Sequence, residues 1–244
     1  MIQFEQCTYH YSKKTPMETV ALQSVNLTFE KSQLTALMGR TGSGKTTMAL
    51  LAAGLLQPTG GDVWVDGLST RNKKTRLEIS RKVGVVFQYP EQQFFCPSVG
   101  EEIEYALKNF QIDNPQRRLT LQALEDVGLN ASYLDRNPFQ LSGGEQRLVA
   151  IASIIVYKPS YLFFDEPTAG LDALAKKRVY RIIKKLEQAG KGVFLITHDV
   201  KCVKREAERL IVLHQGRVYY QGLADGFFTQ PYKMEETGII EPFC

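Results

Sequence analysis

Short apolar segments separated by polar turns recur along the chain, and they alternate with longer segments of helical spacing. Apolar and polar residues alternate over residues 2–11 and 25–29, which predicts two strands joined by a polar hairpin loop that contains Pro16. Continuous apolar runs predict further strands, of the kind that is buried on both faces of a sheet. These runs occupy residues 34–38, 83–87, 161–164 and 193–197.

Helical spacing appears between these runs. Residues 174–189 place their apolar side chains on one helix face and stop before Gly190, which fits a C-terminal cap. Residues 101–110 and 119–127 have the same spacing, so residues 88–155 are expected to form a mostly helical insert. Strands that alternate with helices indicate an α/β protein with a mainly parallel sheet covered by helices.

Composition narrows the class of protein without naming a function. The chain has 244 residues, of which 43% are hydrophobic and 23% charged, as in an ordinary globular protein. Its net charge of +4 is too small to indicate nucleic-acid binding. The four cysteines are scattered without a CxxC pair, which favours reduced thiols in a cytosolic protein. No signal peptide is indicated and no apolar run approaches about 20 residues, so a membrane role is expected to require a partner.

A glycine-rich segment between a predicted strand and a predicted helix fits G-x-x-x-x-G-K-[ST] at residues 39–46. Such a loop wraps its backbone N–H groups around phosphates, and the helix that follows favours an anion at its start. Lys45 brings a charge to the β- and γ-phosphates, and the Thr46 hydroxyl can hold Mg²⁺. An ordinary glycine-rich turn is the alternative. The residues expected to contact the nucleotide here are Gly39, Arg40, Thr41, Gly42, Ser43, Gly44, Lys45, Thr46 and Thr47.

Two adjacent carboxylates, Asp165 and Glu166, follow the apolar run at residues 161–164. Open α/β sheets bind ligands at the carboxyl ends of their strands. If this strand neighbours the strand before the phosphate loop, Asp165 can hold Mg²⁺ and Glu166 can orient or deprotonate an attacking water. The alternative is an acidic pair that stabilises a helix start near Pro167.

A second anion-binding helix start is predicted at residues 141–147, where Ser142, Gly143 and Gly144 precede a helical run at 147–155. One nucleotide does not need two such loops from one chain. We therefore expect this loop to serve a nucleotide that is held by a second subunit. A helix cap with a flexible glycine pair is the alternative interpretation.

The order of these motifs, ending with His198-Asp199, resembles the nucleotide-binding subunit of ATP-binding cassette (ABC) transporters over residues 2–222. The resemblance implies an α/β P-loop NTPase fold with a mainly parallel sheet core, an antiparallel β subdomain and a helical subdomain. It also implies ATP and Mg²⁺ as ligands. The expected divisions are a nucleotide-binding core with the β subdomain at 1–87 and 156–225, a helical subdomain with the signature motif at 88–155, and a C-terminal tail at 226–244.

The same resemblance implies roles for single residues. Tyr11 corresponds to the aromatic residue that stacks on adenine, with Tyr9 as the alternative. Gln88 resembles the glutamine that touches Mg²⁺ and the attacking water, and His198 resembles the residue that contacts the γ-phosphate. Glu145 lies in the signature loop where the family commonly has Gln. The resemblance thus implies that the catalytic residues are Glu166, His198, Lys45 and Gln88, and that Mg²⁺ is held by Thr46, Gln88 and Asp165. It implies that the partner's nucleotide is contacted by Ser142, Gly143, Gly144 and Glu145, and that the opposite subunit is contacted by residues 169–172.

Four further segments are similar to ATPases of energy-coupling-factor uptake systems for vitamins and for cobalt or nickel. They lie at residues 15–18, 39–45, 87–93 and 234–238. This similarity implies a peripheral subunit on the cytoplasmic face of the cell membrane, paired with a second ABC ATPase subunit as a homo- or heterodimer. An integral membrane transport subunit is expected near Gln88–Glu91, and no nucleic acid is expected. Because Glu91 lies beside Gln88, we expect it to pair with an arginine of that partner; an exposed, solvated Glu91 is the alternative.

Other functions stay open at the level of the sequence. The chain could be the ATPase of another ABC importer or a soluble ABC-type ATPase that is not coupled to transport. A nucleotide-binding module without hydrolysis is a third possibility, although Lys45, Asp165, Glu166 and His198 argue against it. The transported substrate is not determined by this chain, because specificity would lie in other subunits.

Overall fold

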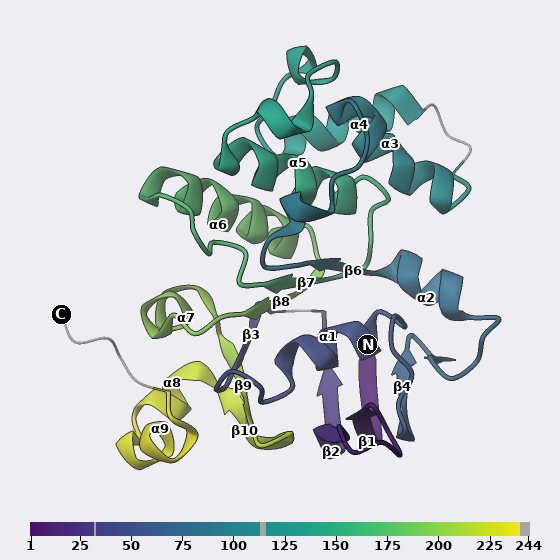
Figure 1. Cartoon of the computed structure of the whole chain (residues 1–244). Helices are drawn as coiled ribbons and strands as arrows, with labels where there is room; N and C mark the ends of the chain where they lie inside the picture. Colours follow the sequence, from purple (N-terminus) through teal and green to yellow (C-terminus); the bar gives the residue numbers. More distant parts are fainter. Residues whose placement is uncertain (32, 113–115, 240–244) are drawn as a thin grey trace.

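Two β-sheets and a group of helices form the part of the chain that this computed structural model describes, residues 1–31, 33–112 and 116–239 (Figure 1). The six-stranded sheet has the order β10-β9-β3-β8-β7-β6, and all neighbours are parallel except the β9–β10 hairpin. Its strands are β3 (Thr35–Met38), β6 (Val83–Val86), β7 (Tyr161–Asp165), β8 (Gly192–Ile196), β9 (Arg209–His214) and β10 (Arg217–Leu223). The mainly parallel core that the sequence predicts is confirmed.

Both faces of this sheet are covered, because every residue of its strands β3, β7 and β8 is buried. In β7, Leu162 and Phe164 belong to one hydrophobic core, while Phe163 between them belongs to the other. Alternate side chains of a strand point to opposite faces, so each face requires its own cover. Helix α6 (Ala173–Gln188) covers one face, and α1 (Lys45–Ala52) with α2 (Arg76–Lys82) packs into the other core.

A four-stranded antiparallel sheet, in the order β2-β1-β4-β5, packs against the second of these cores. The break expected near Gln6 is present, since this residue has φ +45° and the strand pairing shifts around it. Phe29 of this sheet contacts Phe194 of β8, with ring centroids 4.6 Å apart. The strands are β1 (Ile2–Tyr11), β2 (Thr19–Phe29), β4 (Gly60–Val65) and β5 (Leu68–Ser69).

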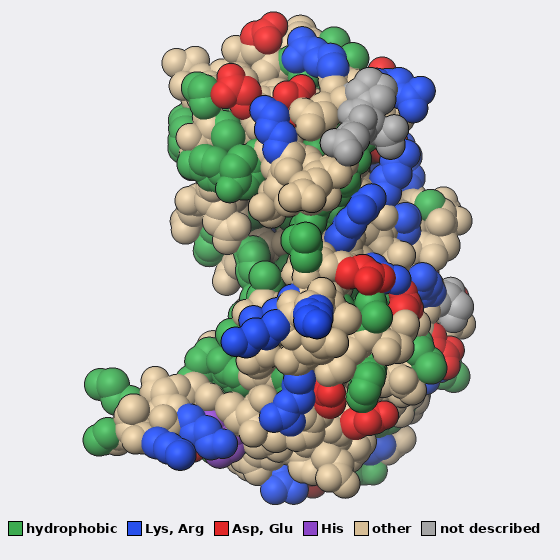
Figure 2. Space-filling view, turned by 90° about the vertical axis from the view of Figure 1, so that its right-hand side faces the viewer, with side chains coloured by type: hydrophobic (Ala, Val, Ile, Leu, Met, Phe, Trp, Pro, Cys, Tyr) green, Lys and Arg blue, Asp and Glu red, His purple; other side chains and the backbone are tan. Residues whose placement is uncertain are grey.

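The segment proposed as the helical subdomain lies beyond the edge strand β6, at the top of Figure 1. Its elements are the 3₁₀ turns η1 (Pro90–Gln93), η2 (Ala131–Tyr133) and η3 (Pro138–Gln140) and the helices α3 (Val99–Asn109), α4 (Gln116–Asp126) and α5 (Gly143–Ile155). Helix α5 begins four residues earlier than predicted, because Ser142 caps it and draws the two glycines into the first turn. Figure 2 shows the molecule's outline indented between this part and the rest, with Lys and Arg side chains interspersed among acidic and polar ones.

The C-terminal part is more ordered than its polar composition indicates. After α7 (Val200–Glu206) and the β9–β10 hairpin, the chain forms the short helices α8 (Ala224–Phe228) and α9 (Pro231–Thr237). Phe227 is fully buried and Ile239 is 6% exposed, so both anchor this segment in the main core. Residues 240–244 of the predicted tail, including Cys244, lie outside the described residues. No helix in the described ranges is long and apolar enough to span a bilayer.

Candidate nucleotide site

The glycine-rich loop connects the end of β3 to the start of α1 and requires glycine at two places. Gly39 has φ +144°, and a Cβ there would lie 2.2 Å from the Leu213 carbonyl oxygen. Gly44 has φ +103° at the N-cap of α1, and a Cβ there would lie 2.5 Å from the Ala21 carbonyl oxygen. Only glycine tolerates both the backbone angles and this close approach. The loop therefore presents the N-terminal N–H groups of α1 as an anion-binding site.

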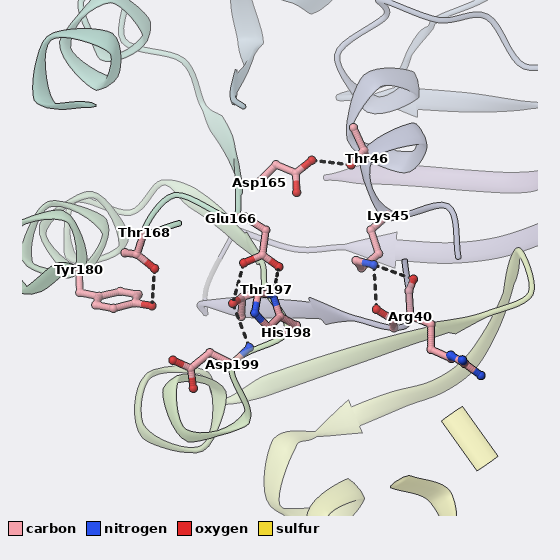
Figure 3. A network of polar contacts seen from close by, with 11 residues as sticks. Arg40, Lys45, Thr46, Asp165, Glu166, Thr168, Tyr180, Thr197, His198 and Asp199 are labelled. Carbon is pink, nitrogen blue, oxygen red and sulfur yellow. Dashed lines mark hydrogen bonds and ion pairs between the residues drawn. The ribbon is translucent and has the colours of Figure 1, made fainter. Parts of the chain in front are cut away.

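The Lys45 side chain curls back into this loop, as Figure 3 shows. Its Nζ donates hydrogen bonds to the carbonyl oxygens of Gly39 at 2.8 Å and Arg40 at 2.9 Å. Burial lowers the pKa of Lys45, and the nearby carboxylates Asp165 and Glu166 oppose that shift. The ammonium group thus lies in the cradle of the loop. A hollow of about 450 Å³ opens beside it, lined by Met38, Gly39, Arg40, Thr41, Lys45, Glu166, His198, Gly238 and Ile239.

Asp165 lies across the loop from Thr46, although its strand is not the neighbour of β3. The role of Asp165 was predicted on the condition that its strand neighbours the strand before the phosphate loop. That condition is not met, because β8 lies between β7 and β3. The two side chains still meet, because the Thr46 hydroxyl donates to Asp165 Oδ2 at 2.5 Å. Burial raises the pKa of Asp165, while the Thr46 hydrogen bond and Lys45 oppose the shift. A hydroxyl and a carboxylate are oxygen donors that fit Mg²⁺.

Glu166 begins a turn in which its backbone has φ +46°, and its N–H donates to the Ile196 carbonyl oxygen at 2.9 Å. Its carboxylate accepts from Thr197 Oγ1 at 3.3 Å and lies 2.7 Å from His198 Nδ1 (Figure 3). The His198 side chain is 83% exposed, so it can also face a ligand. Thr197, which the sequence analysis did not select, thus fixes one carboxylate oxygen while His198 fixes the other.

A second hollow, of about 370 Å³, lies beside the Ser142 loop. It is lined by the N-terminal turn of α5 together with the turn at residues 170–172 and the start of α6. The two hollows share no lining residue, so the two predicted anion-binding helix starts line separate hollows. From the sequence, the Ser142 loop was predicted to contact a second subunit's nucleotide, and residues 169–172 were predicted to contact the opposite subunit. The Ser142 loop and the turn at 170–172 line the same hollow.

Glu145 completes a capping box at this helix start. Its carboxylate accepts from the Ser142 hydroxyl at 2.6 Å and from the Tyr133 hydroxyl at 2.6 Å, while Glu145 N–H donates to Ser142 Oγ. These hydrogen bonds lower the pKa of Glu145 to about 2. In this structure the side chain therefore binds its own helix start, whereas the sequence analysis assigned it to the partner's nucleotide.

The sequence profile of the ABC transporter family matches residues 22–169, which is more than half of the chain. The chain belongs to the ABC transporter family. Among its relatives, the protein of Thermotoga maritima named energy-coupling factor transporter ATP-binding protein EcfA2 is 44% identical over 213 residues, 87% of this chain and 79% of that protein. A protein of the same name from Clostridium perfringens is 38% identical over 245 residues, which are 99% of this chain and 86% of that protein.

Solved structures agree with the fold of an ABC ATPase. The structure of cbiO1 from Clostridium perfringens, described as part of the ABC transporter complex cbiONQ, has a TM-score of 0.81 at 28% identity, covering 99% of this chain and 95% of that one. The dimeric post-hydrolysis state of the ATP-binding cassette MJ0796, bound to ADP and Pi, has a TM-score of 0.80 at 31% identity, covering 92% and 99%. The predicted family, fold and ATPase activity are confirmed.

The remaining predicted site residues of this ABC ATPase differ in whether they contact the rest of the nucleotide site. Gln88 is exposed after β6, and its amide makes no hydrogen bond to another residue in the described ranges. Tyr11 is 39% exposed, and its hydroxyl lies 3.0 Å from Thr47 Oγ1 in the first turn of α1. Tyr9 packs edge-on against Tyr11, with ring centroids 4.8 Å apart. Tyr11 thus lies beside the loop, while Gln88 is not joined to Asp165.

The expected pairing of Glu91 with an arginine of the membrane partner stays a prediction, and within this chain the Glu91 carboxylate pairs with Arg147. Glu91 Oε2 lies 3.2 Å from Nε of Arg147, a side chain that is 1% exposed. A buried guanidinium is stable only with an opposite charge beside it, so Arg147 pairs with Glu91 within the chain. Arg147 was not predicted as a site residue from the sequence, although a charged residue directly before the apolar run 148–152 was a signal for it.

Replacement of Tyr11 by Ala is expected to weaken ATP binding about 5-fold or more, because stacking of an aromatic ring on a base contributes about 1–3 kcal/mol. Tyr11→Phe, which keeps the ring and removes only the hydroxyl bonded to Thr47, should bind nearly as the wild type. Titration with a fluorescent ATP analogue measures both. If Tyr9→Ala has the larger effect, the adenine contact belongs to Tyr9.

Proposed function

We propose that this ABC ATPase is the ATP-hydrolysing subunit of an energy-coupling-factor importer, where it energises uptake of a vitamin or a transition-metal ion through a membrane subunit. The observation that carries the proposal is the pair of separate half-sites, the Lys45 hollow and the Ser142 hollow, which share no residue. The printed names of the Thermotoga and Clostridium relatives support the transport system. A peripheral position on the cytoplasmic face of the membrane follows from this assignment.

In the proposed mechanism the triphosphate lies on the loop at residues 39–46, and Lys45 exchanges its carbonyl contacts for phosphate oxygens. Thr46 and Asp165 would hold Mg²⁺, which neutralises charge that develops on the phosphates during hydrolysis. Glu166 orients the attacking water and accepts its proton, because its carboxylate faces the Lys45 hollow. His198 and Thr197 keep that carboxylate in place.

The Ser142 loop would complete the nucleotide site of a second ATPase subunit. The first turn of α5 lines the second hollow, and its Gly143 and Gly144 N–H groups would meet the partner's phosphates. Glu145 supports this arrangement from behind, since the capping box fixes the helix start. Two nucleotides are then enclosed between two subunits, and opening and closing of that pair drives the membrane subunit.

The membrane subunit is proposed to dock beside Gln88–Glu91, where aromatic side chains are exposed. Phe95 is 60% exposed and Tyr105 is 49% exposed, and their rings pack edge-on with centroids 4.7 Å apart. Tyr89 adds a third exposed ring next to Gln88, at 43%. Exposed aromatic groups of this kind are typical anchors of protein interfaces.

Replacement of Phe95 or Tyr105 by Ser is expected to lower recovery of the membrane complex at least about 10-fold, because loss of a central aromatic anchor costs about 2 kcal/mol or more. ATP binding by the purified subunit should stay within twofold of the wild type. Co-purification from membranes followed by quantitative mass spectrometry measures recovery. Tyr232→Ser is the matched control, since Tyr232 is 56% exposed on α9 and should leave recovery unchanged.

The function itself is tested by purification of the native complex and identification of its subunits. An integral membrane subunit and a second ABC ATPase, with ATP-dependent uptake after reconstitution in vesicles, are the expected result. Recovery of the chain without any membrane subunit, in a preparation that hydrolyses ATP, would favour an ABC ATPase that is not coupled to transport.

A further inference from the structure

Arg147 is the largest fully buried side chain in the described part of the molecule. A charge is taken out of water only where hydrogen bonds and an opposite charge replace the water. Arg147 meets that condition fully. Its Nε and Nη2 lie 3.2 and 3.4 Å from the two carboxylate oxygens of Glu91, Nη1 donates to the Pro167 carbonyl oxygen at 2.6 Å, and Nη2 donates to the Ala169 carbonyl oxygen at 3.4 Å.

These contacts join three segments that are far apart in the sequence. Arg147 lies in α5, five residues after Ser142. Glu91 lies in η1, three residues after Gln88, and in the sequence it falls between the exposed Tyr89 and Phe95. The two carbonyl groups belong to the turn that begins at Glu166. One guanidinium therefore connects helix α5, the proposed docking segment at η1 and the turn that begins at the proposed base, Glu166.

The turn after Glu166 depends on such support. Glu166 has φ +46°, a left-handed conformation that is unfavourable for a residue with a side chain. Within the turn, the Ala169 N–H donates to the Glu166 carbonyl oxygen at 3.1 Å. The guanidinium binds the carbonyl oxygens of residues 167 and 169, one on each side of Thr168. These two hydrogen bonds fix the direction in which the turn leaves Glu166.

We propose that Arg147 is a positioning residue that makes the placement of Glu166 depend on the position of η1, and hence on the partner docked there. Glu91 cannot move away from a buried guanidinium without leaving an unpaired charge, so the pair moves as a unit. Displacement of η1 pulls Arg147 against the carbonyls of residues 167 and 169 and tilts the Glu166 carboxylate. This inference rests on the assignment of Glu166 as the base.

A double-mutant cycle on the purified complex separates positioning from stability. Arg147→Met and Glu91→Met are each expected to lower Tm, since each leaves one buried charge unpaired, and the double variant should recover Tm. We expect kcat of the double variant to stay at least about 10-fold low, because small misplacements of a catalytic group have effects of this order, with KM for ATP within twofold. Recovery of both Tm and kcat would show a structural role only and overturn the proposal.

Arg147→Lys decides the question if the methionine variants fail to fold. Lysine keeps a charge for Glu91 but loses the fork that reaches both carbonyl groups. We expect near wild-type Tm with kcat reduced at least about 10-fold, whereas kcat within twofold of the wild type would reject the proposal. Arg71→Lys is the matched control, because Arg71 Nη1 donates to the Gly61 carbonyl oxygen at 2.7 Å, away from both hollows, and should leave Tm and kcat unchanged.

Failure of this inference and failure of the Glu166 assignment give different results. If Glu166→Gln retains wild-type turnover, the base is misassigned whatever Arg147 does. If Glu166→Gln is inactive while Arg147→Lys is fully active, only the positioning role is rejected.

Discussion

Glu166→Gln is expected to bind ATP as the wild type does and to lose at least about 100-fold in turnover, because a positioned general base contributes about 10²–10⁴-fold. Glutamine has the same shape as glutamate but cannot accept the proton of the attacking water. It can still bond to Thr197 and His198, which hold the carboxylate at 3.3 and 2.7 Å, so the turn should remain folded. Phosphate release by the purified chain measures turnover, and nucleotide titration measures binding.

Two further variants make this result specific. Thr197→Val removes one hydrogen bond to Glu166 and should lower kcat by a smaller factor than Glu166→Gln, without a change in ATP affinity. Asp165→Asn should weaken the dependence of binding on Mg²⁺, because Asp165 faces Thr46 and not the water. Turnover near that of the wild type in Glu166→Gln would remove the carboxylate from the mechanism.

The parts of the site that the sequence predicted are those set by local backbone geometry. The loop at 39–46 needs glycine where a Cβ would meet the Leu213 or Ala21 carbonyl oxygens, and such requirements leave a readable spacing. The Ser142 cap is likewise a property of four consecutive residues. The apolar runs predicted the buried strands for a similar reason, since every position of β7 and β8 is buried.

Long-range contacts were not predictable in this way. Strand order depends on packing of the whole sheet, so the sequence did not reveal that β8 lies between β3 and β7. Glu91 and Arg147 are 56 residues apart, and only the fold shows that they pair with each other. Helices α8 and α9 are short, and their stability comes from burial of Phe227 and Ile239 in a distant core and not from a periodic pattern.

Gly143→Asp is expected to abolish turnover, with a loss of at least about 100-fold, while the stability of the subunit stays unchanged or rises. A Cβ at Gly143 meets nothing within 4 Å, and the residue lies in the first turn of α5, so the fold accommodates the side chain. Replacement of a helical glycine and an acidic group at a helix N-terminus are both favourable for folding. The lost activity would come from a carboxylate placed where N–H donors should meet the partner's phosphates.

This combination separates a shared nucleotide site from a helix cap. If the Ser142 loop only starts α5, Gly143→Asp should raise Tm slightly and leave phosphate release at the wild-type level, because the Lys45 hollow has no lining residue in common with it. If the loop closes on a neighbour's ATP, Tm and turnover must change independently, and ATP binding to the isolated chain must persist. Gly143→Asn, equal in size but uncharged, should retain more turnover than Gly143→Asp, since only the aspartate repels the partner's triphosphate.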